Sequence, residues 1–139
     1  KEKEPLKLTD TELAYFEYLS RAKVVGLGEA THGTKEFFQM KHRLFKYFLE
    51  HFSHKVFAFE MDFSEALIFN EYVQTGNGNI VQLIKDKMYF WTWNTSEVKD
   101  FLVWMKDYNI GKYEKDSFPP LLEENFLCIL AKHIIRTII

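Results

Sequence analysis

Apolar residues recur along the chain with two different periods, which separate the expected helices from the expected strands. Between residues 36 and 52 they fall on one broad face at about 100° per residue, which predicts an amphipathic helix. Two short apolar runs, 23–27 and 56–59, flank this helix, and each is typical of a buried strand. The order strand, helix, strand predicts two parallel strands joined by a right-handed crossover. We therefore expect an α/β fold with a short parallel sheet and flanking helices.

Shorter helices are expected at four other places: residues 11–20, 62–75, 80–87 and 97–109. Residues suited to cap a first helical turn mark three of these starts: Thr9 or Asp10, the pair Asp62 and Glu65, and Thr95 or Ser96. Glycine follows two of the helices, at Gly76 and at Gly111, as is common at helix ends.

Length, composition and charge narrow the class of protein. The 139 residues predict one domain over 1–139, and 47% hydrophobic with 27% charged residues is the composition of a folded chain. A net charge of −2 supplies no basic field for phosphates, so we expect a small-molecule partner and no nucleic acid. The polar start and the lack of an apolar run of about 18 residues argue against a signal peptide and a membrane span. The single cysteine, Cys128, fits a cytoplasmic protein.

The chain changes character after Gly111. A mostly charged stretch, two prolines and a tail that ends on apolar residues follow. Two parallel strands alone would leave both edges of the sheet unpaired, and natural domains usually cover or extend such edges. We expect an incomplete domain with a divergent tail over 112–139, whose sheet edges are covered by further strands or by a second copy of the chain.

Residues capable of acid–base chemistry follow both expected strands. Glu29 and His32 come after the first strand, in the stretch GLGEATHG, and Glu60 comes directly after the second. Open parallel sheets bind ligands at the carboxyl ends of their strands, so the three side chains converge if the strands are neighbours. A neutral histidine there can take a proton from water while carboxylates fix its tautomer or receive protons. This pattern indicates a hydrolytic site, and a glycine-rich bend without chemistry is the alternative.

Lys41 is a fourth candidate. It falls near the middle of the apolar face of the long predicted helix, where a charge is costly unless it is paired or reaches water. We expect a carboxylate partner, Glu29 or Glu60, and the ammonium can also stabilise a developing oxyanion. The alternatives are that Lys41 extends toward solvent and that Glu60 only caps a helix or forms an ion pair.

Several sharper motifs are absent from the sequence. Thr31 stands where a dinucleotide-binding fingerprint needs its last glycine, and Glu29 would repel a pyrophosphate. No His-Glu-x-x-His zinc motif and no Gly-x-Ser-x-Gly nucleophile elbow occur. We therefore expect no cofactor and no serine hydrolase.

Short motifs occur in an order that resembles the erythromycin esterase family over about residues 5–109. They are GEATHG at 28–33, KEFF at 35–38, KHRL at 41–44, FAFE at 57–60, WTWNT at 91–95 and Tyr108 with Asn109. The resemblance implies an α/β hydrolytic domain in which a histidine activates water to open an ester or macrolactone, without an acyl-enzyme and without an obligatory metal. By position, it implies that His32 is the general base and that Glu29 and Glu60 are its acidic partners. Lys41 stands where the family has a basic residue.

The sequence departs from the family pattern after Asn109. Members of the family are much longer, and neither their next strand nor their distal histidine segment has a counterpart in 112–139. The resemblance thus favours a truncated hydrolase that is incomplete without the downstream part. Two alternatives stay open: a non-catalytic module that binds a metal or haem through His32 and the carboxylates, and a degenerate remnant of the enzyme.

Overall fold

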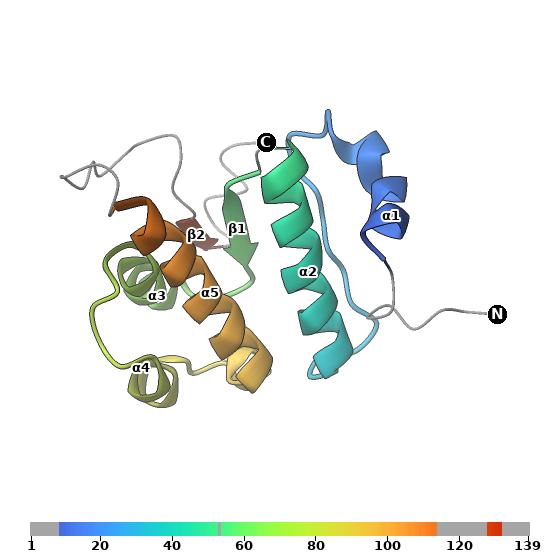
Figure 1. Ribbon diagram of the computed structural model, residues 1–139. Helices are drawn as coiled ribbons and strands as arrows, with labels where there is room; N and C mark the ends of the chain where they lie inside the picture. The colour runs from blue at the N-terminus through green and yellow to red at the C-terminus, as the bar shows by residue number, and fades with distance from the viewer. Residues whose placement is uncertain (1–8, 53, 114–127, 132–139) are drawn as a thin grey trace. The chain divides into compact units, whose positions relative to one another are not determined.

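The computed structural model describes residues 9–52, 54–113 and 128–131, which are mainly helical (Figure 1). The chain divides into two compact units, Lys1–His54 and Lys55–Ile139. None of the described helices is both long enough and apolar enough to cross a membrane.

The first unit contains a short α-helix, a 3-10 helix and one long α-helix: α1 (Asp10–Leu13), η2 (Ala14–Leu19) and α2 (Lys35–Phe52). Thr9 caps α1, because its hydroxyl accepts from the Glu12 N–H at 3.3 Å while the Glu12 carboxylate accepts from the Thr9 N–H at 2.8 Å. The helix expected over 11–20 is therefore present as two short pieces. The long helix expected over 36–52 is confirmed.

The core of the first unit forms where α1 meets the apolar face of α2. Leu13, Leu44 and Phe48 are buried there. Partly buried apolar side chains pack around these three: Phe16, Leu19, Val25, Leu27, Met40, Tyr47 and Phe52. The apolar face of α2 is thus buried against its neighbours, as the periodicity of its apolar residues predicted.

The expected strand at 23–27 is wrong, because residues 24–29 have no regular secondary structure. Val25 and Leu27 are half-buried against the core of the first unit, whereas Val24, which precedes Val25, is 55% exposed. This alternation buries one side of the segment, and no described strand pairs with it. A β ladder needs such a partner, and apolar character alone does not supply it.

The described residues of the second unit form two strands and four helical segments: β1 (Val56–Phe59), α3 (Phe63–Thr75), α4 (Ile80–Lys87), η3 (Trp91–Trp93), α5 (Ser96–Tyr113) and β2 (Cys128–Ala131). β1 pairs in parallel with β2, with Val56 opposite Cys128 and Phe59 opposite Ala131. Among the described residues the strand that pairs with 56–59 is thus 128–131, where the sequence predicted 23–27. The helix expected to end at 109 continues past Gly111 to Tyr113.

Most of the predicted tail, 112–139, lies outside the described residues. Within it the structure describes only the end of α5 and strand β2. The prediction of a divergent tail stays a prediction, as does the single domain over 1–139.

The core of the second unit lies around α3, which packs against α5 and β2 (Figure 1). Phe69, Val73 and Met105 are fully buried in it. Asn109 is also fully buried, and its amide donates to the Val73 carbonyl at 2.9 Å. This bond satisfies a polar side chain that would be costly to bury alone.

The expected capping pair of α3 is half correct. The Asp62 carboxylate accepts from the Phe63 N–H at 3.1 Å and caps the helix. Glu65 does not cap it, since its side chain is buried and accepts from the Tyr89 N–H at 2.9 Å. Glu65 therefore ties α3 to the segment after α4.

Replacing Gly76 by alanine is expected to destabilise the protein by roughly 1–2 kcal/mol. Gly76 ends α3 at a φ of 72°, a left-handed conformation that disfavours other residues. An added Cβ would also lie 2.8 Å from Cδ1 of Ile110. Urea unfolding followed by circular dichroism measures the loss. Gly26→Ala is the control, because a Cβ there meets nothing within 4 Å and its φ is not positive; equal losses would contradict the explanation.

Candidate functional site

The loop that precedes α2 carries two of the four candidate residues. Glu29 and His32 lie in it, and α2 then begins at Lys35. Gly33 has a φ of 82°, so the chain turns there through a conformation that glycine adopts at little cost. Lys41 stands on α2 itself, within the same unit.

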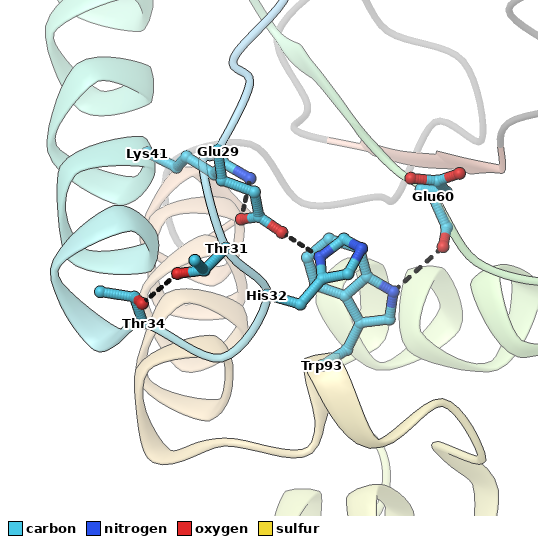
Figure 2. A network of polar contacts seen from close by, with 7 residues as sticks. All are labelled: Glu29, Thr31, His32, Thr34, Lys41, Glu60 and Trp93. Carbon is cyan, nitrogen blue, oxygen red and sulfur yellow. Dashed lines mark hydrogen bonds and ion pairs between the residues drawn. The ribbon is translucent and has the colours of Figure 1, made fainter.

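The carboxylate of Glu29 joins the other two residues (Figure 2). Its Oε1 contacts Nδ1 of His32, and its Oε2 accepts from Nζ of Lys41 at 2.7 Å. The side chains of Glu29 and Lys41 are only 8% and 13% exposed, whereas that of His32 is 48% exposed. The network therefore has a largely buried charged pair at one end and a solvent-accessible imidazole at the other.

This geometry assigns the tautomer of a neutral His32. An ionised carboxylate can only accept hydrogen bonds, so Nδ1 must carry the proton that is shared with Glu29. In the neutral ring the other nitrogen, Nε2, then has the lone pair that accepts a proton. Glu29 is thus placed to orient a histidine base and to stabilise the imidazolium that forms when it acts.

The charge of Glu29 is maintained by its partners. Burial raises the pKa of the Glu29 carboxyl, but the hydrogen bonds from Lys41 and His32 and their charges outweigh burial, so that the pKa lies below its ordinary value. Glu29 is therefore ionised at neutral pH.

Lys41 has the carboxylate partner that its place on the apolar face of α2 requires. The contact with Glu29 confirms one of the two expected pairings, and extension toward solvent does not describe a side chain this deeply buried. The ammonium also lies 5.5 Å from the ring centre of Phe38, within the range of a cation–π contact.

Two threonines beside His32 belong to the same loop and escaped the sequence reasoning. The hydroxyls of Thr31 and Thr34 are 2.6 Å apart (Figure 2). In the sequence, Thr31 stood out only as a departure from a dinucleotide-binding motif. The spacing of two hydroxyl residues around His-Gly was the available signal.

Glu60 belongs to the second unit and follows β1. Its backbone carbonyl accepts from the indole N–H of Trp93 at 3.0 Å (Figure 2). Trp93 is buried, with its ring edge-on to Phe59, so this tryptophan is part of the core as the sequence suggested. Trp91, two residues earlier, is 64% exposed. The indole of Trp93 therefore holds the main chain at Glu60, and Glu60 is itself exposed.

Glu60 lies in a different unit from Glu29, His32 and Lys41, so the convergence of all four residues stays a prediction. The structure brings together three of them through direct contacts within the first unit. Among the side chains that the structure describes, no group of three or more His, Cys, Asp or Glu is placed to hold a metal ion.

Comparison with known proteins gives matches over most of the chain. A family model described as erythromycin esterase matches residues 49–118. Erythromycin esterase type II of Escherichia coli is 31% identical over 120 residues, which cover 82% of this chain and 28% of that protein. A contiguous match of that size must include the span from Glu29 to Glu60, wherever it begins.

Two solved structures resemble this chain in fold as well as in sequence. A Bacillus cereus protein matches with a TM-score of 0.69 and 28% identity, over 91% of this chain and 28% of that one. A succinoglycan biosynthesis protein matches with a TM-score of 0.71 and 32% identity, over 94% of this chain and 30% of that one. The chain thus spans less than a third of the length of these relatives.

Replacing Glu29 by glutamine is expected to lower the free energy of unfolding at neutral pH by about 2–3 kcal/mol, because a nearly buried ammonium loses its ionised partner. The lowered pKa of Glu29 sets the sign of the pH dependence: its contribution is present above the unfolded-state pKa and is lost as the pH falls through the folded-state pKa. Denaturant unfolding of wild type and E29Q across the acid range measures the difference, which should shrink below about pH 4.5.

The matched control for E29Q is Glu36→Gln. Glu36 is on α2, its side chain is 45% exposed, and its Oε1 lies 4.0 Å from Nζ of Lys35. This change is expected to cost less than about 0.5 kcal/mol. A loss for E29Q no larger than that of the control, or one that does not depend on pH, would show that the Glu29 network adds little stability.

Proposed function

The chain belongs to the erythromycin esterase family, and from this premise we propose that it forms part of an ester hydrolase in which His32 activates a water molecule. The observation that carries the proposal is the contact of an ionised, nearly buried Glu29 with Nδ1 of an accessible His32. That arrangement is the one that a histidine general base needs.

In the proposed reaction Nε2 of His32 takes a proton from water as the water oxygen attacks the ester carbonyl carbon. A tetrahedral intermediate forms, and its bond to the alkoxy oxygen then breaks. The imidazolium returns the proton to the departing alkoxide, which leaves an acid and an alcohol. Glu29 stabilises the imidazolium through Nδ1, so no bond between enzyme and acyl group is required.

Lys41 supports this base through Glu29. The ammonium is directed at Oε2 of Glu29 and is largely buried, which favours a role in holding the carboxylate ionised and oriented over direct stabilisation of an oxyanion. A lysine that touches the carboxylate rather than the substrate is a positioning residue. Its loss should therefore act through the orientation of His32.

Glu60 is proposed as a second acid of the site, supported by its place after β1 and by the match of the family model to residues 49–118. The tie between the Glu60 carbonyl and Trp93 would hold the start of the loop after β1 steady. In this proposal Glu60 and His32 serve the same reaction, and this chain contributes the amino-terminal part of an α/β hydrolytic domain.

The substrate is proposed to be a small-molecule ester. The Escherichia coli relative is named for erythromycin, so a macrolactone is the first ester to test. This chain spans 28% of that relative, so the rest of a complete site would be supplied by further chain or by a second copy. A cytoplasmic location is proposed with it, because the one cysteine of the sequence needs no oxidising compartment.

Replacing His32 by alanine is expected to reduce the rate of ester hydrolysis by about 10²-fold or more, the contribution typical of a positioned base. Hydrolysis of a macrolactone and of a chromogenic ester by the wild-type chain and by H32A measures the effect. His51→Ala is the control, because His51 is an exposed histidine on α2 outside the Glu29 network. Equal rates of hydrolysis for wild type and H32A would sink the proposal.

Replacing Glu60 by glutamine tests whether this carboxylate takes part in the reaction. We expect kcat to fall by at least about tenfold, since an acid that assists proton transfer is lost. Glu71→Gln, an exposed acidic residue on α3 in the same unit, is expected to leave kcat unchanged. If E60Q keeps the wild-type rate, Glu60 has no part in the chemistry, and His32 with Glu29 would have to act without it.

A further inference from the structure

The imidazole of His32 stands on an exposed loop although its partners are largely buried. Thr31, His32 and Gly33 are all exposed, whereas the side chains of Glu29 and Lys41 are not. Surface loops usually move more than the elements that they connect. A base that must meet its substrate in one orientation therefore needs its loop held in place.

A bond between two hydroxyls spans the loop at His32. Oγ1 of Thr31 and Oγ1 of Thr34 are 2.6 Å apart, one on each side of the His-Gly pair. The left-handed φ of 82° at Gly33 turns the chain back, which allows the two side chains to meet. The loop that carries the imidazole is thus closed by a side-chain hydrogen bond.

Thr34 is itself fixed to the first turn of α2. It directly precedes the helix, and its carbonyl accepts from the Phe37 N–H at 3.1 Å. Lys41 stands on the same helix. The bond between the hydroxyls of Thr31 and Thr34 therefore links the loop at His32 to α2, which also carries Lys41. Glu29 contacts both His32 and Lys41.

We propose that Thr31 and Thr34 are positioning residues for the hydrolytic base, a role that rests on the proposed function. Their hydrogen bond holds the backbone of His32 so that Nδ1 meets Glu29 and Nε2 is presented to water. Neither threonine touches the substrate in this scheme. Loss of the bond leaves the ring attached to a looser loop, and a small misplacement of a catalytic group lowers the rate strongly.

The test uses Thr31→Val and Thr34→Val, which remove the hydroxyl and keep the shape of the side chain. We expect kcat to fall about tenfold while KM changes less than about twofold, because orientation of the base is lost and binding is not. Thr31→Ser and Thr34→Ser are expected to restore most of the rate. Thr75→Val is the control, since it removes an exposed hydroxyl that donates to the Glu71 carbonyl in the other unit.

Nitrogen-15 NMR of the His32 ring supplies a readout that does not need activity. Wild type is expected to show one tautomer with the proton on Nδ1, and the valine variants a mixture of both. Equal hydrolysis by wild type and H32A together with this change in tautomer would refute the proposed function and keep the positioning role. Full activity and a single tautomer in T31V would overturn the positioning role itself. Loss of helical signal in the valine and serine variants alike would overturn it too, since the pair would then only cap α2.

Discussion

The first unit depends on one nearly buried carboxylate. Glu29 has lost most of its contact with water, and such a charge persists only where opposite charges and hydrogen bonds replace the solvent. His32 from the same loop and Lys41 from α2 supply that replacement. The same requirement holds for Lys41, which the apolar face of α2 would otherwise reject. The ion pair of Glu29 and Lys41 thereby holds the loop against α2, because neither charge would be stable there without the other.

Helix α2 links the packing of the first unit to its candidate site. Its apolar face packs against Leu13 and against the segment that contains Val25 and Leu27, and this burial of apolar surface fixes where the loop begins. The loop ends at the start of the same helix. The loop that carries Glu29 and His32 is therefore held by α2 at both of its ends. Precise sites are commonly supported by rigid elements in this way.

The second unit uses buried polar groups to hold its segments. Glu65 ties α3 to Tyr89, and Asn109 of α5 binds the Val73 carbonyl of α3. Trp93 holds the main chain at Glu60 in the same way. Each of these side chains satisfies a backbone group across a large separation in sequence, so each links packing to the geometry of a loop. Membership of the erythromycin esterase family gives the exposed Glu60 its functional interest.

The sequence by itself determined the features that depend on near neighbours: the amphipathic α2, the strand at 56–59 and the ends of α3. Tertiary structure alone decided that 23–27 packs on a helix without becoming a strand, that β1 pairs with 128–131, and that Glu65 is a tie and not a cap. It also made Glu29 a partner of Lys41. Periodicity and capping depend on interactions between residues a few positions apart. Strand pairing and buried charge pairs depend on groups far apart in the chain.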